Sequence, residues 1–431
     1  MRTIPFALAL FLFFAFQIGM SQESALNNAS LEEIAERFFP IFIEGKDTLQ
    51  TFEISDTIRS FTQNAAYKAA VKQFNQMFGG VGELKKKGMI QPGPTIRTVE
   101  LFYSGKTNSF MASVTFTENQ ITGVWFKPWT DEPAHGGTPI QLQTPTGTLY
   151  GTLLEPEKAT KPVPIVLFLS GSGPTDRNGN QLPTLHTDAF RLLAEALQQN
   201  GVASVRFDKR GVGASAEAGR DESKLRFEHY VDDAVLWIGL LSQEKKYSKI
   251  IVLGHSEGSL IGMLACIPSK NVDGFISLCG AGRPIDEVIR EQMKGQPPSV
   301  KDSLFPILDE LKKGKTVEKV PEVLLSLVRP SVQPYVISQM RYDPQKEIKK
   351  LTLPVLIVQG TTDIQVLVND ADKLSEANPQ AKKVVVKNMN HTLKKSETTI
   401  ALLQQPCYTD PKYPIHEDLV PSLTEFIAAV R

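Results

Sequence analysis

The sequence contains few cysteines and histidines, and neither positive nor negative charge is in excess. Its 431 residues include three cysteines and six histidines, and Lys plus Arg equals Asp plus Glu at 47 each. The zero net charge argues against the basic excess that nucleic-acid-binding proteins carry, so we expect no nucleic-acid partner. Cys266 falls in an expected helix and Cys279 at an expected strand end, where buried small apolar residues are typical. An exported chain could oxidise one pair, but we predict no disulfide framework.

Long apolar runs are missing beyond the N-terminus. A positively charged start precedes an almost wholly apolar stretch at 6–16, and polar, small residues follow at 17–24. This pattern is typical of a signal peptide, here residues 1–21 with cleavage near Ser21. An uncleaved anchor is the alternative, but the apolar run is short for a membrane span. We expect an exported protein, periplasmic or secreted, without a stable membrane anchor after cleavage.

The length of the chain predicts more than one hydrophobic core. Residues 22–128 are expected to form a small α+β domain, because amphipathic helical patterns are followed by β-rich stretches joined by turn residues. The helical patterns lie at 31–39, where Ser30 is the expected N-cap, and at 65–78; the strand patterns lie at 95–103, 109–117 and 120–126. A stretch rich in Pro and Gly at 127–137 is the expected linker.

Residues 138–431 read as a catalytic domain of the α/β class. A hairpin pattern at 140–154 is followed by alternating strand and helix patterns, which predicts a mostly parallel, doubly wound sheet. The alternation breaks at about 284–343, a charged segment with several prolines that we interpret as a helical cap insertion. Ligands of such sheets bind at the carboxyl ends of the strands, and the candidate catalytic residues all follow expected strands.

The candidate nucleophile is Ser256, within Gly254-His255-Ser256-Glu257-Gly258. The apolar run 249–253 before it predicts a buried strand, and residues 259–265 after it predict a helix. Strand, sharp turn and helix is the setting of a nucleophile elbow, in which side chains at Gly254 and Gly258 would collide with neighbouring elements. A chance match in a glycine-rich turn is the alternative, and this setting disfavours it.

A serine hydroxyl needs a histidine to accept its proton and an acid to orient that histidine. In this fold the three residues follow in the order Ser, acid, His. Asp363 follows the strand pattern 353–360, and His391 lies in the loop after the strand pattern 384–386. For Asp363 a simple Asx turn is the alternative, and for the base His416 is the main rival of His391.

The oxyanion of the reaction needs two backbone N–H donors. Glu257, directly after the nucleophile, is expected to supply one. The other is expected from Ser172 in the loop 170–180, after the strand pattern 163–169. This loop lacks the Gly-Lys-Ser/Thr ending of a phosphate-binding loop, which argues against a nucleotide site. A second turn, 208–215, carries Arg210, which we interpret as a structural ion-pair partner.

From about residue 140 onward the chain resembles the α/β-hydrolase-fold serine hydrolases. It is similar to bacterial esterases that combine an N-terminal NTF2-like (cystatin-like) domain, resembled here by layout, with four motifs. These motifs stand at Gly171–Gly179 (GSGPTDRNG), Asp208–Ser215 (DKRGVGAS), Gly254–Gly258 (GHSEG) and Asn390–Lys394 (NHTLK). The resemblance implies carboxylesterase activity on small-molecule, short-acyl esters with no metal and no cofactor.

Two other functions stay open. Kinship with serine aminopeptidases implies that the same triad could serve a peptidase or amidase acting on exported peptides, with Asp286 and Glu287 as candidate binders of a substrate amine. A catalytically inert binding module is the third reading, and the complete Ser, Asp and His set argues against it. Oligomeric state does not follow from the sequence.

Overall fold

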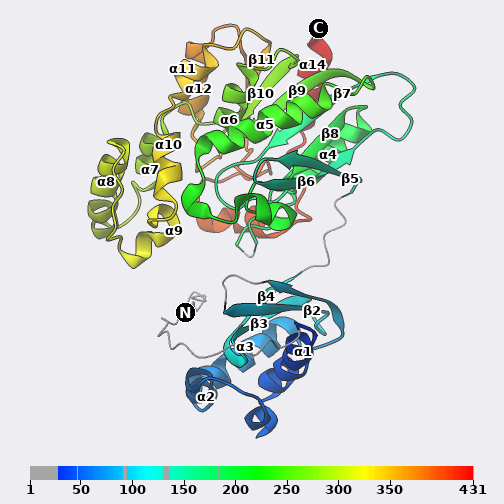
Figure 1. Ribbon diagram of the computed structural model, residues 1–431. Coiled ribbons are helices and arrows are strands. Elements are labelled where there is room, and N and C mark those ends of the chain that lie inside the picture. Colours follow the sequence, from blue (N-terminus) through cyan, green and yellow to red (C-terminus); the bar gives the residue numbers. More distant parts are fainter. Residues whose placement is uncertain (1–27, 46, 91–94, 130–135, 183, 431) are drawn as a thin grey trace. The chain divides into compact units, whose positions relative to one another are not determined.

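The computed structural model describes residues 28–430 except 46, 91–94, 130–135 and 183. The predicted signal peptide and part of the predicted linker lie outside these residues. The chain divides into two compact units, Met1–Pro133 and Ala134–Arg431. Figure 1 labels most of the helices and strands of each unit.

Four helical segments open the first unit. They are α1 (Asn28–Glu44), the 3₁₀ turn η1 (Asp47–Thr51), α2 (Asp56–Thr62) and α3 (Ala65–Phe78). The predicted helix α3 is confirmed: the side chain of Asn64 accepts a hydrogen bond from the N–H of Tyr67 at its start, and Gly79 ends it with φ 69°. The predicted start of α1 is wrong, because this helix already includes Asn28 and Ser30 is inside it.

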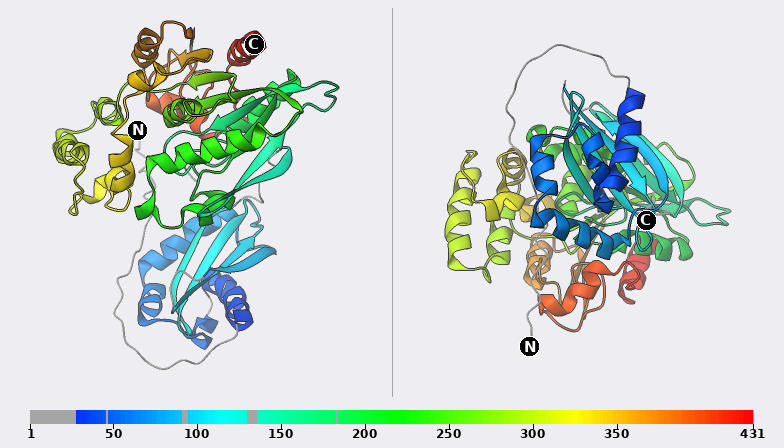
Figure 2. Two further views of the ribbon diagram at one scale, coloured as in Figure 1. Left: turned by 45° about the horizontal axis from the view of Figure 1, so that its top comes forward. Right: turned by 90° about the horizontal axis from the view of Figure 1, so that it is seen from below.

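An antiparallel sheet in the order β1-β2-β3-β4 completes this unit, and the helices, blue in Figure 2, cover one of its faces. Its strands are β1 (Leu84–Ile90), β2 (Ile96–Tyr103), β3 (Phe110–Thr117) and β4 (Gln120–Pro128). The sequence predicts only the last three. The first strand carries Lys85, Lys86, Lys87 and Gly88, which hide the alternation of a strand but suit the edge of a sheet. Aromatic rings of Phe39, Phe74 and Phe110 pack between helices and sheet.

The second unit contains an eight-stranded sheet in the order β12-β11-β10-β9-β7-β8-β6-β5. Its strands are β5 (Thr138–Thr144), β6 (Gly147–Leu154), β7 (Val163–Leu169), β8 (Ala203–Phe207), β9 (Tyr247–His255), β10 (Gly274–Leu278), β11 (Val355–Gly360) and β12 (Lys382–Val386). The β5–β6 hairpin and the β6–β8 pair are antiparallel, and all other pairs are parallel. The predicted α/β-hydrolase fold class is confirmed.

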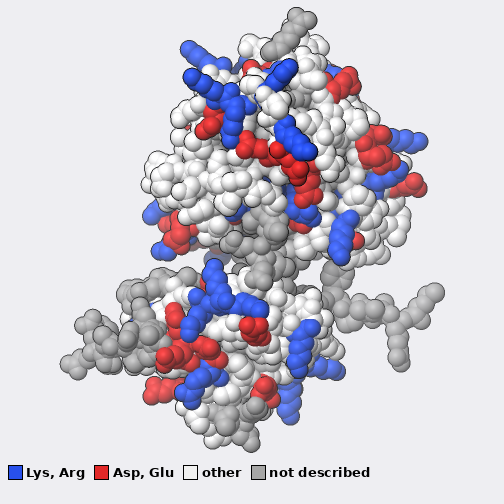
Figure 3. Space-filling model, turned by 90° about the vertical axis from the view of Figure 1, so that its right-hand side faces the viewer, with Lys and Arg blue, Asp and Glu red and all other residues white. Residues whose placement is uncertain are grey.

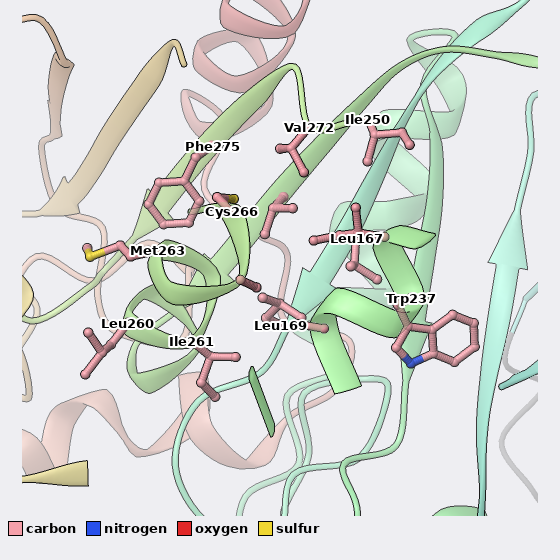
Figure 4. Close-up of a cluster of buried hydrophobic side chains, with 14 of the residues drawn as sticks. Leu167, Leu169, Trp237, Ile250, Leu260, Ile261, Met263, Cys266, Val272 and Phe275 are labelled. Carbon is pink, nitrogen blue, oxygen red and sulfur yellow. The ribbon is translucent and has the colours of Figure 1, made fainter. Parts of the chain in front are cut away.

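Helices cover both faces of this sheet. The apolar cluster of one face draws side chains from α5 (Phe227–Leu241), α6 (Glu257–Cys266) and α12 (Val368–Ala377). Figure 4 shows part of it, with Leu260, Ile261 and Met263 of α6 beside Phe275 of β10. The cluster of the other face draws on α4 (Ala189–Gln199) and α14 (Leu419–Ala429). This double cover buries β7, β9, β10 and β11. The loops after β7, β9 and β11, together with the loop after the edge strand β12, carry the candidate site residues.

The segment between β10 and β11, which includes the cap insertion predicted at about 284–343, is helical; we call it the cap, and its position over the site stays a prediction. It consists of α7 (Ile285–Gln292), α8 (Pro298–Lys312), η4 (Glu322–Leu324), α9 (Leu325–Val328) and α10 (Gln333–Gln339), and α11 (Pro344–Ile348) leads back to the sheet. The cap has an apolar cluster of its own, with Leu304, Leu308 and Leu311 fully buried. It is fastened to the sheet domain by Ser338, whose Oγ accepts a hydrogen bond of 2.8 Å from the buried first N–H of α5, that of Phe227.

Late in the chain, the 3₁₀ turn η5 (Ala401–Gln404) and α13 (Gln405–Thr409) precede α14; η2 (Gly213–Gly219) and η3 (Glu222–Lys224) follow β8. Acidic and basic side chains are interspersed over the face drawn in Figure 3, as the balanced composition suggests. None of the helices in the described ranges has the length and hydropathy needed to cross a bilayer.

Candidate active site

Ser256 occupies a strained turn between β9 and α6, with φ 55° and ψ −121°. Two glycines make this turn possible. A Cβ at Gly254 would lie 2.1 Å from the carbonyl oxygen of Gly258, and a Cβ at Gly258 would lie 2.2 Å from the carbonyl oxygen of Leu169 in β7. The predicted reason for both glycines is therefore confirmed. A non-glycine residue held at this φ is a strained conformation of the kind that gathers at functional sites.

Asp363 and His391 are in direct contact. Asp363 lies in the loop after β11, His391 lies in the loop after β12, and both are buried. The Nδ1 atom of His391 is 2.8 Å from Oδ2 of Asp363. The carboxylate can therefore accept a hydrogen bond from Nδ1–H, and Nε2 is then the nitrogen that can act as a base.

Several donors hold the Asp363 carboxylate in its ionised form. Its Oδ1 accepts the backbone N–H groups of Gln365 and Val366, and its Oδ2 also accepts the amide of Gln359. Burial acts to raise the pKa of Asp363, but the His391 imidazole and these N–H donors outweigh it, so the pKa lies below its ordinary value. Asp363 thus also forms the Asx turn that was considered as the alternative, and this turn orients its carboxylate.

His255 connects the nucleophile turn to His391. Its ring centroid is 4.8 Å from that of His391, and its Nε2 lies 2.9 Å from the His391 carbonyl oxygen, to which it donates. Burial, and then the neighbouring His391, lower the pKa of His255 to about 3, so this ring is neutral at physiological pH. Within the described part of the chain the Ser256 hydroxyl has no protein hydrogen-bond partner. Its neighbour in sequence, His255, is the residue that contacts His391, and the triad assignment stays a prediction.

The loop that carries Ser172 passes over the nucleophile. A Cβ built at Gly171 would be 3.1 Å from the Cβ of Ser256. The Ser172 carbonyl accepts a hydrogen bond of 2.6 Å from the Gln181 amide. Glu257 is the first residue of α6, where a helix has backbone N–H groups without an acceptor in the helix. Gly171, the residue before Ser172, and Glu257 thus both lie next to Ser256, and the two oxyanion donors stay predictions.

Lys209 is a site residue that the sequence analysis does not single out. Its ammonium is buried, 2.8 Å from the carbonyl oxygen of Gly171 and 3.0 Å from Oε1 of Glu257. It lies in the Asp208–Ser215 turn beside Arg210, and that motif is the one signal that could have pointed to it. Arg210 itself pairs with Asp233 of α5, as predicted for a structural ion pair.

The remaining candidates lie elsewhere or are already paired. His416 is buried near α14, and its Nδ1 accepts the N–H of Asp418. Asp286, one of the two acids considered as amine binders, is buried and pairs with Lys312 inside the cap. Its neighbour Glu287 lines a cap groove that also holds Arg290, Lys294 and Lys301.

Among the residues that the structure describes, one group has the composition of a metal site. Ligand atoms of His255, Cys279 and His391 lie within 4.8 Å of one another. Each histidine uses one ring nitrogen in a hydrogen bond, to Asp363 or to the His391 carbonyl, and keeps the other available. Burial raises the pKa of Cys279 well above its ordinary value, so its thiol stays protonated and is a poor ligand. The three cysteines are free and buried.

The sequence resembles known hydrolases. Residues 184–397 match the Hydrolase_4 family model, described as serine aminopeptidase, S33, and this range includes Ser256, Asp363 and His391. The curated esterase EstD of Thermotoga maritima is 28% identical over 245 residues, which are 55% of this chain and 56% of that protein. The match thus spans little more than half of the relative.

Solved structures with a similar fold include the following two. The ferulic-acid-bound Est1E of Butyrivibrio proteoclasticus is 17% identical, with 68% of this chain and 98% of that chain covered and a TM-score of 0.46. The Pyrococcus furiosus esterase Pf2001 is 17% identical, with 70% and 94% covered and a TM-score of 0.45. At this identity and TM-score they carry no argument about substrate.

Proposed function

We propose that this protein is an exported serine carboxylesterase that cleaves small esters of short acyl groups through an acyl-enzyme. The contact that supports this most is the 2.8 Å hydrogen bond between His391 and Asp363, beside a serine held in a strained strand-to-helix turn. Similarity to a curated esterase over about half its length supports the same class of reaction.

In the proposed reaction, Ser256 Oγ attacks the ester carbonyl while Nε2 of His391 accepts its proton. Asp363 keeps the Nδ1 proton in place and stabilises the imidazolium that forms. The N–H groups of Ser172 and Glu257 donate hydrogen bonds to the oxyanion. His391 then returns the proton to the leaving alcohol, and water attacks the acyl-enzyme by the reverse sequence, which releases the carboxylic acid and restores Ser256.

The peptidase reading has less support. An aminopeptidase needs a carboxylate that is available to a substrate amine, and the buried acids beside the proposed triad are engaged: Glu257 with Lys209 and Asp363 with His391. In the cap, Oδ2 of Asp286 pairs with Lys312, and Glu287 lies in a groove with three basic residues. An unpaired carboxylate would cost free energy in such buried positions, so these pairs are expected to persist when substrate binds. Neutral esters fit this arrangement better than peptides with a free amine.

The experiment that tests the proposal measures hydrolysis of p-nitrophenyl esters from acetyl upward by the mature protein. We expect turnover that falls with acyl length, and loss of about 10³-fold or more in kcat for Ser256→Ala at unchanged folding. Ser269→Ala is the matched control, because Ser269 ends the same helix region and its Oγ binds only the Ala265 carbonyl. Near-normal activity of Ser256→Ala would refute the assignment, and turnover of peptides but not esters would favour the peptidase.

A further inference from the structure

A buried lysine connects the two expected oxyanion donors. The ammonium of Lys209 contacts three groups: the Gly171 carbonyl oxygen at 2.8 Å, Oε1 of Glu257 at 3.0 Å and the ring face of Tyr230, whose centroid is 4.4 Å away. The side chains of Lys209 and Glu257 are 5% and 4% exposed, so neither charge is screened by much water. The ion pair is therefore part of the core beneath the site.

The contact of the Lys209 ammonium with the Gly171 carbonyl affects the peptide group between Gly171 and Ser172. The oxygen that accepts from Lys209 and the N–H that is expected to bind the oxyanion belong to this single trans peptide, and they point in opposite directions. A cation at the oxygen end draws electron density through the amide and makes the N–H a stronger donor. The ammonium also fixes the rotation of the peptide, so its N–H keeps its direction before substrate arrives.

Glu257 completes the link on the other side. Its backbone N–H is the second expected donor, at the start of α6, while its side chain holds Lys209. One ion pair thus sets the positions of both donors, although the residues lie 48 positions apart in sequence. Tyr335 of the cap extends the cluster: burial, followed by the Glu257 carboxylate, raises the pKa of its phenol well above the ordinary value.

We propose that Lys209 is a positioning residue of the esterase, which holds and polarises the Gly171–Ser172 peptide so that the Ser172 N–H binds the oxyanion. The ammonium does not touch the substrate; it acts through one peptide bond, and Glu257 balances its charge. This role rests on the proposed function, because it concerns the transition state of the same reaction.

The test compares Lys209→Met with the double variant Lys209→Met/Glu257→Gln. In both, kcat should fall about 10-fold, which is less than the loss of a whole oxyanion donor, while KM stays within about 3-fold. Affinity for a boronic acid that mimics the tetrahedral state should fall by a similar factor. The melting temperature should fall in the single variant, where Glu257 is buried without a partner, and recover in the double variant.

Lys249→Met is the matched control. Lys249 also donates to backbone carbonyls, those of Ile427, Ala428 and Val430, but it lies at the opposite end of β9 from Ser256. It should leave kcat and the boronic acid affinity unchanged.

Two results would overturn the positioning role while wild-type turnover stands. One is a Lys209→Met enzyme with unchanged kcat; the other is a double variant that recovers kcat together with its melting temperature, since that would mark a purely structural pair. If the wild type itself neither turns over esters nor reacts with a fluorophosphonate at Ser256, the proposed function fails, and this role with it.

Discussion

At the scale of single residues, His255, the neighbour of the proposed nucleophile, is costly to protonate in the folded protein. Its ring packs against His391 and Phe190, and its Nε2–H donates to the His391 carbonyl. Protonation would place a cation in a buried position beside a second imidazole. Because protonation is unfavourable there, the pKa of His255 is lowered to about 3, and the free energy of unfolding therefore depends on pH.

We predict that His255 makes the fold sensitive to mild acid. Because its folded pKa of about 3 lies below the unfolded value of 6.5, the unfolded chain takes up the proton first, and stability falls as pH drops from about 6.5 toward 3. The free energy of unfolding should be about 2 kcal/mol lower at pH 5 than at pH 7 through this residue alone.

Urea unfolding of wild type and His255→Gln at the two pH values measures this contribution. The glutamine amide can still donate to the His391 carbonyl but does not titrate. The loss of unfolding free energy between pH 7 and pH 5 should therefore be about 2 kcal/mol smaller in His255→Gln than in the wild type. His229→Gln, in the first turn of α5, serves as a control for loss of a histidine. An equal pH dependence of wild type and His255→Gln would contradict the prediction.

At the scale of elements, the cap is held to the sheet domain by a helix-capping contact. The Oγ of Ser338 satisfies the first N–H of α5, and Arg226, the residue before this helix, makes no side-chain cap bond. Ser338→Ala should therefore cost about 1–2 kcal/mol, because it leaves a buried N–H without an acceptor. Chemical denaturation measures the loss.

The control for this prediction is Ser303→Ala in α8. The Ser303 hydroxyl is exposed and donates to the carbonyl of Ser299 four residues earlier, so its removal should change stability by less than about 0.5 kcal/mol. Equal effects of the two variants would show that the Ser338 contact does not stabilise the fold.

The strands of the large sheet could be predicted from sequence because their physical cause is local. Runs such as Ile250–Leu253 and Val355–Val358 are β-branched and apolar, and both strands are buried on two faces. Strand β1 could not be predicted in this way, because its three lysines give no alternation and only the pairing with β2 makes it a strand. The start of α5 at Phe227 is not a local matter either, since its first turn depends on Ser338, which lies 111 residues away in sequence.

The site was predictable to the extent that its residues stand at strand ends in a fixed order. Ser256, Asp363 and His391 follow β9, β11 and β12, and chain order with strand position was enough to choose them. Lys209 and Gln359 were not predictable by this means. Their roles arise from partners that no spacing rule connects to them, namely the Gly171 carbonyl and the Asp363 carboxylate.

At the scale of the whole molecule, two units each bury an apolar core of their own. The first unit packs its aromatic residues between helices and sheet, and the second packs both faces of its eight-stranded sheet. The resemblance of the first unit to NTF2-like domains, and its role, stay predictions, as does the predicted export.

We predict that residues 134–431 fold without the first unit. The fragment contains every residue of the proposed triad and oxyanion site, so it should unfold in one cooperative thermal transition and react with a fluorophosphonate at Ser256. Circular dichroism and intact mass measure the two properties, and Ser256→Ala in the same fragment controls the labelling. An aggregated or unlabelled fragment would mean that the first unit is needed for a competent site.

The cap enters and leaves the sheet between β10 and β11, which remain paired in register from Phe275 with Val355 to Leu278 with Val358. Evolution could therefore lengthen, shorten or replace this segment without moving any strand that carries a triad residue. The same holds for a designed chimera: a foreign cassette grafted between these strands could change which acyl group is accepted. The graft would have to supply an acceptor for the first N–H of α5 in place of Ser338, and donors for the Glu222 carboxylate in place of Arg329 and Ser331.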